Sequence, residues 1–167
     1  MADISPVKSL LADSSSLQNC LDAAYRYLSY RPRSEAEIRQ RLRQRSFDNE
    51  VIEKAIARLR EQSLSDDFDF AQFWRESRLS SKPKSKELIS KELRDKKVAV
   101  EIVEQVISGI DDEENAYKLG SSRMNAIAHL DYPGFRRRLF NYLGYRGFNY
   151  EVINRTIATL WQEKERH

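Results

Sequence analysis

The chain has 167 residues, 29 of them basic and 26 acidic, so the net charge is only +3. Its charged content of 33% exceeds the usual quarter, and a single compact globule is therefore not required. One cysteine excludes an internal disulfide framework, and two histidines cannot assemble a zinc site with the usual ligand spacing.

The sequence shows no pattern of export or membrane insertion. Its first residues lack the basic-then-apolar layout of a signal peptide, and no apolar run approaches the roughly 20 residues that a membrane span needs. We therefore expect a cytoplasmic protein that does not bind a membrane. Five Gly and four Pro favour long helices over many short strands, so the expected fold class is all-α.

The N-terminal segment, residues 1–16, contains three consecutive serines at positions 14–16, and we expect it to be flexible. A first helix is predicted for about Leu17 to Tyr30. Pro32 disfavours helical geometry in the residue before it. This proline therefore separates the first helix from the next one.

A middle helix is predicted to begin near Ser34. Ser34 followed by Glu37 is a capping-box signature, in which each residue satisfies a backbone N–H group of the other. Ile38 and Leu42 then lie four residues apart with polar residues around them, as expected for one buried face. Asp48 is the predicted N-cap of a third, closing helix.

The closing helix carries apolar residues at i, i+1, i+4, i+5 and i+8, a spacing that places five side chains on one face. The same succession of features recurs when the chain is shifted by 51 and by 101 residues. Each copy has a proline, an apolar pair, a further apolar residue, a glutamate and the five-residue set. The copies are Pro32, Ile38, Leu42, Phe47, Glu50, Val51, Ile52, Ala55, Ile56, Leu59; Pro83, Ile89, Leu93, Val98, Glu101, Ile102, Val103, Val106, Ile107, Ile110; and Pro133, Leu139, Leu143, Phe148, Glu151, Val152, Ile153, Thr156, Ile157, Leu160. Only Thr156 breaks the apolar pattern.

The later copies predict the same three helices. Their first helices are expected at about Asp69 to Ser80 and about Glu113 to Met124, and Asn149 is a predicted N-cap. Acidic pairs mark the boundaries, which gives repeats at 17–66, 67–112 and 113–167. Because a unit of this size buries little apolar surface alone, we expect three tandem three-helix repeats in an elongated, curved array. A compact bundle is the alternative.

Basic residues crowd the middle helices. Six arginines and two glutamates between positions 31 and 45 give a local excess of +4, and residues 82–97 and 136–146 repeat a basic excess. Such a surface can bind phosphates or an acidic protein groove, because arginine makes bidentate contacts with both groups. A solvated helix surface would look the same. The residues alone leave both interpretations open.

One position is basic in all three repeats: Arg45, Lys96 and Arg146. This recurrence predicts either a shared contact with a partner or an interaction with the C-terminal carbonyls of the middle helix.

Several runs resemble a known family. Residues 27–38, Tyr-Leu-Ser-Tyr-Arg-Pro-Arg-Ser-Glu-Ala-Glu-Ile, followed by Leu42, Phe47-Asp48, Val51-Ile52, Leu59, Leu64-Ser-Asp-Asp67 and Phe70-Ala71, resemble the RecX regulatory proteins of bacteria. Residues 146–153, Arg-Gly-Phe-Asn-Tyr-Glu-Val-Ile, resemble the third repeat of the same family. The similarity runs from about residue 20 to the C-terminus.

The resemblance implies a monomeric regulator that binds RecA filaments and inhibits recombinase, ATPase and co-protease activity. Contact with single- or double-stranded DNA is a further implication, and a stand-alone helical-repeat nucleic-acid-binding protein is the alternative. The expected contact residues for the filament or DNA are Arg31, Arg33, Arg39, Arg43, Arg45, Lys82, Lys84, Lys96, Arg136, Arg137, Arg138 and Arg146.

No constellation indicates catalysis. The acidic runs 66–69 and 111–114 lie at helix junctions, where acids complement a helix N-terminus, and we expect that role rather than metal binding. Cys20 has no nearby basic partner, and no phosphate-binding loop is present. We therefore expect neither an enzyme nor a metal or cofactor. Among the aromatics, Tyr30, Tyr132 and Tyr145 are the best candidates for exposure.

Overall fold

The computed structural model describes residues 6–166, with side chains from Asp13 to Arg166. Residues 6–166 form ten helices and no strand, so the all-α prediction is confirmed. The helices are α1 (Pro6–Leu28), α2 (Glu35–Gln44), α3 (Asn49–Glu61), α4 (Asp67–Leu79), α5 (Lys86–Asp95), α6 (Val100–Ile107), α7 (Asp112–Ser121), α8 (Met124–Ile127), α9 (Tyr132–Tyr145) and α10 (Tyr150–Arg166). None of these helices combines the length and apolar character that a membrane crossing demands.

The helices pack into two compact units. The first unit contains the chain up to Phe73 together with Lys96–Ile102, and the second contains Trp74–Asp95 and the chain from Val103 onward. Helices α1 to α3 therefore belong to the first unit and α7 to α10 to the second, while the second repeat contributes residues to both.

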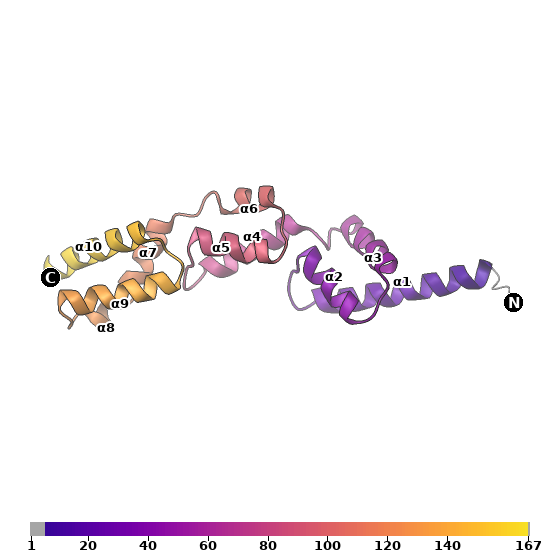
Figure 1. Ribbon diagram of the computed structural model, residues 1–167, viewed down its shortest axis with the longest axis horizontal. Coiled ribbons are helices and arrows are strands. Elements are labelled where there is room, and N and C mark those ends of the chain that lie inside the picture. The colour runs from indigo at the N-terminus through magenta and orange to yellow at the C-terminus, as the bar shows by residue number, and fades with distance from the viewer. Residues whose placement is uncertain (1–5, 167) are drawn as a thin grey trace. The chain divides into compact units, whose positions relative to one another are not determined.

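In the first unit, α2 and α3 pack against α1 (Figure 1). The predicted apolar set of the closing helix faces this core, where Ile52, Ala55, Ile56 and Leu59 are fully buried. Cys20 on α1 is also fully buried, and burial raises the pKa of its thiol to about 11. The core thus forms where the three apolar faces meet.

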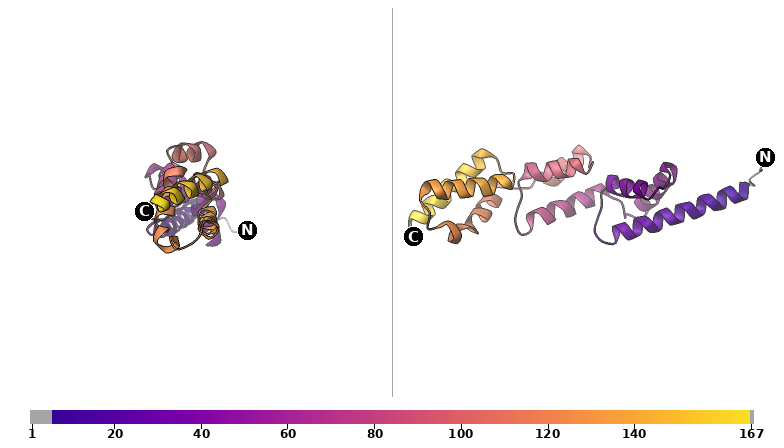
Figure 2. Two further views of the ribbon diagram at one scale, coloured as in Figure 1. Left: turned by 90° about the vertical axis from the view of Figure 1, so that its left-hand side faces the viewer. Right: turned by 60° about the horizontal axis from the view of Figure 1, so that its bottom comes forward.

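In the second unit, α10 packs against α7 and α9, and Figures 1 and 2 show it beside α9. Phe135, Leu139 and Leu143 of α9 are buried in this core. Thr156, the one polar residue in the repeated apolar set, is buried as well. A Cβ atom at Gly120 would lie 2.5 Å from Leu160 Cδ1, so glycine is what lets α7 approach α10 closely.

Two sequence expectations need correction. The first helix begins at Pro6 rather than near Leu17, because proline is compatible with a first helical position and nothing between it and Leu28 interrupts the helix. The expected flexibility of the N-terminal segment stays a prediction. Residues 1–5 lie outside the described residues. The first helix of the third repeat ends at Ser121, and the short helix α8 follows, where the sequence predicted a helix to about Met124. The elongated array stays a prediction.

The predicted caps are largely found. Ser34 and Glu37 form the capping box at the start of α2. Asn149 Oδ1 accepts the backbone N–H of Val152 at 2.9 Å and so caps α10. Asp48 occupies the N-cap position of α3 but its side chain makes no capping hydrogen bond.

Every middle helix ends on a residue with positive φ. These residues are Ser46, Lys97 and Gly147, with φ of 62°, 62° and 87°. They occupy the same position in the three repeats, and a left-handed residue here is a common way to end a helix. Only Gly147 adopts this conformation without the steric cost of a side chain.

Replacing Gly147 tests how tightly this turn is packed. A Cβ atom would lie 2.7 Å from both Leu88 Cβ and Ser85 Oγ, and the positive φ adds backbone strain. Gly147→Ala is expected to lower the free energy of unfolding by about 2–4 kcal/mol, measured by urea denaturation.

Gly144→Ala is the control, because it adds a methyl group to a helix at 4.0 Å from Ile153 Cδ1. It is expected to be neutral or to stabilise by about 0.5–1 kcal/mol. Equal midpoints for the two variants would contradict this account.

Candidate partner-binding surface

Arg39 joins two helices within the first unit. Its guanidinium contacts Glu53 of α3 at 2.8 Å and Glu35, one turn earlier on α2, at 3.1 Å. Arg60 of α3 donates to Glu35 as well. Burial would raise the pKa of the Glu35 carboxyl, but the hydrogen bonds from Arg60 and Arg39 outweigh it and lower that pKa. Arg39 therefore holds α2 against α3, and its side chain is only 23% exposed.

Arg31 and Arg33 precede α2 and are also engaged within the protein. Arg31 contacts Glu37 at 2.9 Å. The guanidinium carbon of Arg33 lies 4.1 Å from the centre of the Tyr27 ring on α1, a cation–π contact. Both arginines thus stabilise the corner between α1 and α2.

Residues of the second repeat contribute to the N-terminal cap of α2. Ser34 Oγ accepts the N–H of Glu37 at 3.2 Å and donates to the carbonyl of Lys96 at 3.0 Å. Lys96 Nζ contacts Glu37 at 2.8 Å, and Asp67 Oδ1 accepts the N–H of Glu35 at 2.9 Å. Backbone N–H groups that have no partner within a helix are thereby satisfied.

The start of α5 repeats this arrangement within the second unit. Ser85 Oγ accepts the N–H of Leu88 at 3.1 Å, and the N–H of Ser85 donates to the carbonyl of Arg146 at 3.0 Å. Asp112 Oδ1 accepts the N–H of Lys86 at 2.8 Å. At both junctions, an aspartate at the start of a later helix therefore accepts a hydrogen bond from the first backbone N–H group of the middle helix.

The recurrent basic position has two different environments. Lys96 pairs with Glu37, and Arg146 donates to the carbonyl of Lys82 at 3.0 Å, so both residues stabilise a junction between repeats. Arg45 is exposed and makes no ion pair with any described residue. The charge at this position is thus explained by structure in the second and third repeats, and only Arg45 is open to a partner.

Lys84 belongs to a half-buried cluster around Glu92. The Glu92 carboxylate accepts hydrogen bonds from Lys84 Nζ, from Arg78 Nε at 2.7 Å and from Trp74 Nε1 at 2.8 Å. Burial would raise the pKa of Glu92, but these three donors outweigh it and lower that pKa. Lys84 is therefore engaged inside the second unit, where it shares the single carboxylate of Glu92 with Arg78.

The remaining predicted residues differ in exposure. Arg136 is half-buried, donates to Asn154 at 3.3 Å and lies 5.6 Å from the Phe140 ring. The exposed ones are Arg43, Arg45, Lys82, Arg137 and Arg138. Arg43 donates to Asn49 at 3.0 Å, whereas the other four pair with no carboxylate in residues 13–166. These five residues are the ones available to a partner.

A basic hollow of about 150 Å³ lies between α1 and α2. It is lined by Ala23, Arg26, Tyr27, Tyr30, Arg41 and Arg45, and none of them is acidic. Tyr30 is 83% exposed, as the sequence predicted. Arg26 and Arg41 were not among the expected contacts. The spacing could have indicated them, because Arg26 lies four residues before Tyr30 and Arg41 four before Arg45, which would put each pair on one face if the helix continued that far. In the structure Tyr30 follows α1 and Arg45 is the C-cap of α2.

The acidic runs at the repeat boundaries cap helices, as predicted. Asp66 Oδ1 accepts the N–H of Phe68 at 2.7 Å at the start of α4. Asp111 Oδ1 accepts the N–H groups of Glu113 and Glu114, both at 3.0 Å, at the start of α7.

Three family models match the chain in succession. They describe the first, second and third three-helix domains of RecX, and they match residues 20–59, 66–107 and 111–157. The chain belongs to the RecX family. The three tandem three-helix repeats predicted from the sequence are thereby confirmed.

Curated relatives support the same assignment over most of the chain. The regulatory protein RecX of Chlorobaculum tepidum is 30% identical over 153 residues, which cover 91% of this chain and 94% of the relative. The regulatory protein RecX of Prosthecochloris aestuarii is 32% identical over 146 residues, covering 87% and 96%. The family consists of regulatory proteins rather than enzymes.

Solved RecX structures share the fold. A crystal structure of RecX from Lactobacillus salivarius superposes with a TM-score of 0.75 at 23% identity, covering 88% of this chain and 97% of the other. A second RecX crystal structure gives a TM-score of 0.76 at 20% identity, covering 93% and 79%.

The junction around Glu37 predicts a pH-dependent stability. Burial would raise the pKa of this carboxyl, but hydrogen bonds from Arg31, Lys96 and the Ser34 N–H outweigh it and lower the pKa from 4.5 to about 2. A lowered carboxyl pKa stabilises the folded state above the unfolded-state pKa, and this stabilisation is lost as the pH falls toward the folded-state pKa. Glu37→Gln keeps the size of the side chain and removes its charge. It is expected to cost about 1–3 kcal/mol at pH 7, and less as the pH falls from about 5 toward 2.

Urea denaturation of both proteins across this pH range measures the effect. Glu87→Gln on α5 is a control, because Glu87 forms an exposed ion pair with Arg94 at 3.1 Å. A Glu37→Gln deficit that stays constant from pH 7 to pH 3 would show that the charge is not responsible.

Proposed function

We propose that this RecX-family chain binds RecA nucleoprotein filaments as a monomer in the cytoplasm and inhibits their recombinase, ATPase and co-protease activity. We further propose that it catalyses no reaction itself. The observation that carries the proposal is the group of exposed basic residues that no carboxylate neutralises, on a member of a family of regulatory proteins.

The division of the basic residues decides which ones we assign to the contact. Arg39, Lys84, Lys96 and Arg146 have partners within the chain, and replacing them would disturb packing as well as charge. The exposed cations have no carboxylate partner among residues 13–166 that they would give up, and Arg43 alone of them donates to a described side chain, that of Asn49. We therefore assign filament contact to Arg43, Arg45, Lys82, Arg137 and Arg138.

The second candidate is direct binding of single- or double-stranded nucleic acid without RecA. It is favoured by Tyr30 and Tyr145, each 83% exposed, because an exposed aromatic ring beside basic residues can stack on a base. Tyr30 shares the basic hollow with Arg41 and Arg45. The two candidates differ in salt dependence, since counterion release makes DNA affinity fall steeply with salt.

RecA's DNA-dependent ATP hydrolysis tests the first proposal. The wild-type protein, titrated at fixed single-stranded DNA, is expected to inhibit below one molecule per RecA. The triple variant Arg45→Ala, Lys82→Ala, Arg137→Ala is expected to need at least about tenfold more protein, because each exposed ion pair contributes up to about 1 kcal/mol.

A matched control variant distinguishes a specific contact site from a general effect of net charge. The variant Arg58→Ala, Lys118→Ala, Arg155→Ala removes the same net charge from exposed ion pairs on α3, α7 and α10. It is expected to inhibit like the wild type. Equal loss in both triple variants would mean that net charge alone acts. No inhibition by the folded wild-type protein would overturn the proposal and favour direct nucleic-acid binding.

A further inference from the structure

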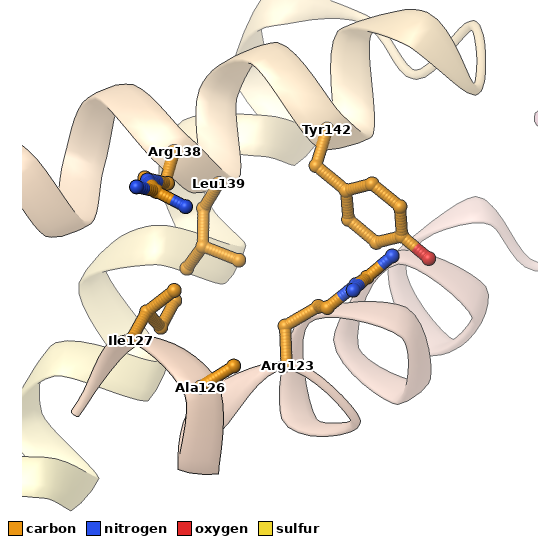
Figure 3. A pocket seen from close by; sticks show the side chains of 6 residues that line it. All are labelled: Arg123, Ala126, Ile127, Arg138, Leu139 and Tyr142. Carbon is orange, nitrogen blue, oxygen red and sulfur yellow. The ribbon is translucent and has the colours of Figure 1, made fainter.

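The third repeat contains a hollow of about 160 Å³ with an apolar floor and basic walls. Ile127 of α8 and Leu139 of α9, both buried, form its floor together with Ala126. Figure 3 shows Arg138 and Arg123 on opposite sides of this space, with Tyr142 above Arg123. The volume suits one apolar side chain rather than a larger ligand.

The two arginines are not neutralised within the protein. Arg123 and Arg138 are both exposed, neither forms an ion pair with a described residue, and no acidic side chain lines the hollow. The guanidinium carbon of Arg123 lies 4.5 Å from the centre of the Tyr142 ring, a cation–π contact. Such a contact uses no N–H acceptor, so the guanidinium can still donate to a carboxylate.

The second repeat differs at the equivalent position. Leu93 and Leu143 are equivalent in the repeat, so Glu92 occupies the place of Tyr142. Glu92 accepts hydrogen bonds from Trp74, Arg78 and Lys84. In the third repeat Tyr142 replaces this carboxylate and Arg138 replaces Leu88, so the hollow there has cations and no acidic lining residue.

A polypeptide fits the hollow better than a nucleic acid does. The guanidinium carbons of Arg123 and Arg146 lie 4.5 Å and 6.0 Å from the centre of the Tyr142 ring, so a base would have to compete with these cations to stack on it. The floor of Ile127, Leu139 and Ala126 offers a phosphodiester backbone nothing to contact, whereas an apolar side chain would bury it favourably.

We infer that this hollow binds an acidic polypeptide segment, with one apolar side chain on the floor and flanking carboxylates paired with Arg123 and Arg138. The inference goes beyond filament regulation and requires no RecA. It holds for any protein partner that presents such a segment.

Fluorescence anisotropy with a defined peptide tests the inference. The probe is a fluorescein-labelled peptide in which one Leu lies between two Asp-Glu pairs, titrated with the full-length protein at about 0.1 M salt. Saturable binding is expected. Replacing the Leu of the peptide by Ser is expected to weaken binding about three- to tenfold, because the floor loses its apolar contact.

Protein variants locate the contact. Arg138→Ala and Arg123→Ala are each expected to weaken peptide binding about three- to tenfold. Arg138 is exposed and makes no ion pair with a described residue, so its replacement leaves the fold intact. Arg155→Ala is the matched control, because it removes the same charge from an exposed pair with Glu113 on the same unit. It is expected to stay within about twofold of the wild type.

Three outcomes would overturn the inference. The first is no saturable binding of the peptide by the folded wild-type protein up to about 1 mM, an affinity limit near 4 kcal/mol. The second is equal affinity for the Leu and Ser peptides together with unchanged binding by Arg138→Ala. The third is that the wild-type protein binds a thymidine dodecamer but not the peptide, and that Arg123→Ala and Arg138→Ala lose the binding of the dodecamer. The hollow would then bind nucleic acid. RecA is absent from every arm, so a failure here leaves the ATPase result untouched.

Discussion

The first N–H groups of a helix have no partner within that helix, and this constraint organises the junctions between repeats. At α2 and at α5 the missing acceptors come from two places at once. A serine at the helix start supplies one, and the aspartate at the first position of a later helix, Asp67 of α4 or Asp112 of α7, supplies the other. A middle helix is therefore completed only when its successor is folded, which couples neighbouring repeats through specific hydrogen bonds as well as apolar burial.

The same junctions divide the basic residues into two groups. Lys96 and Arg146 lie where one repeat meets another, and their charges are engaged by Glu37 and by the carbonyl of Lys82. Arg45 occupies the equivalent position in the first repeat but has no such partner among the described residues. At this position the basic residue therefore stabilises a junction in the second and third repeats. In the first repeat, the equivalent Arg45 stays exposed.

Periodicity was sufficient to predict the closing helices and their buried faces, because burial along a helix follows a spacing of 3.6 residues, but it did not predict α8 or the start of α1. It was not sufficient to predict the site. Arg39 and Arg41 lie two residues apart on α2 with equal charge, yet Arg39 pairs with Glu53 of another helix while Arg41 lines the basic hollow. Which of them is free depends on a tertiary contact across 14 positions, and no local pattern records such a contact.

The hollow of the third repeat was missed for a related reason. Arg123 follows α7 and Tyr142 lies on α9, and the short helix α8 between them was not predicted. Composition alone predicts one basic run at 136–138. Arg138 lines the hollow and its two neighbours do not, because successive residues on a helix point in directions about 100° apart.

The burial of Cys20 has a practical consequence for the fluorescence labelling of this protein. Burial raises the pKa of the thiol well above neutral pH, so the sulfur is largely protonated as well as shielded from solvent. A maleimide dye would therefore react far faster with a cysteine introduced on the surface than with the native one. Donor and acceptor fluorophores can be attached at chosen exposed sites without removing the natural thiol, so distances between repeats become measurable in solution.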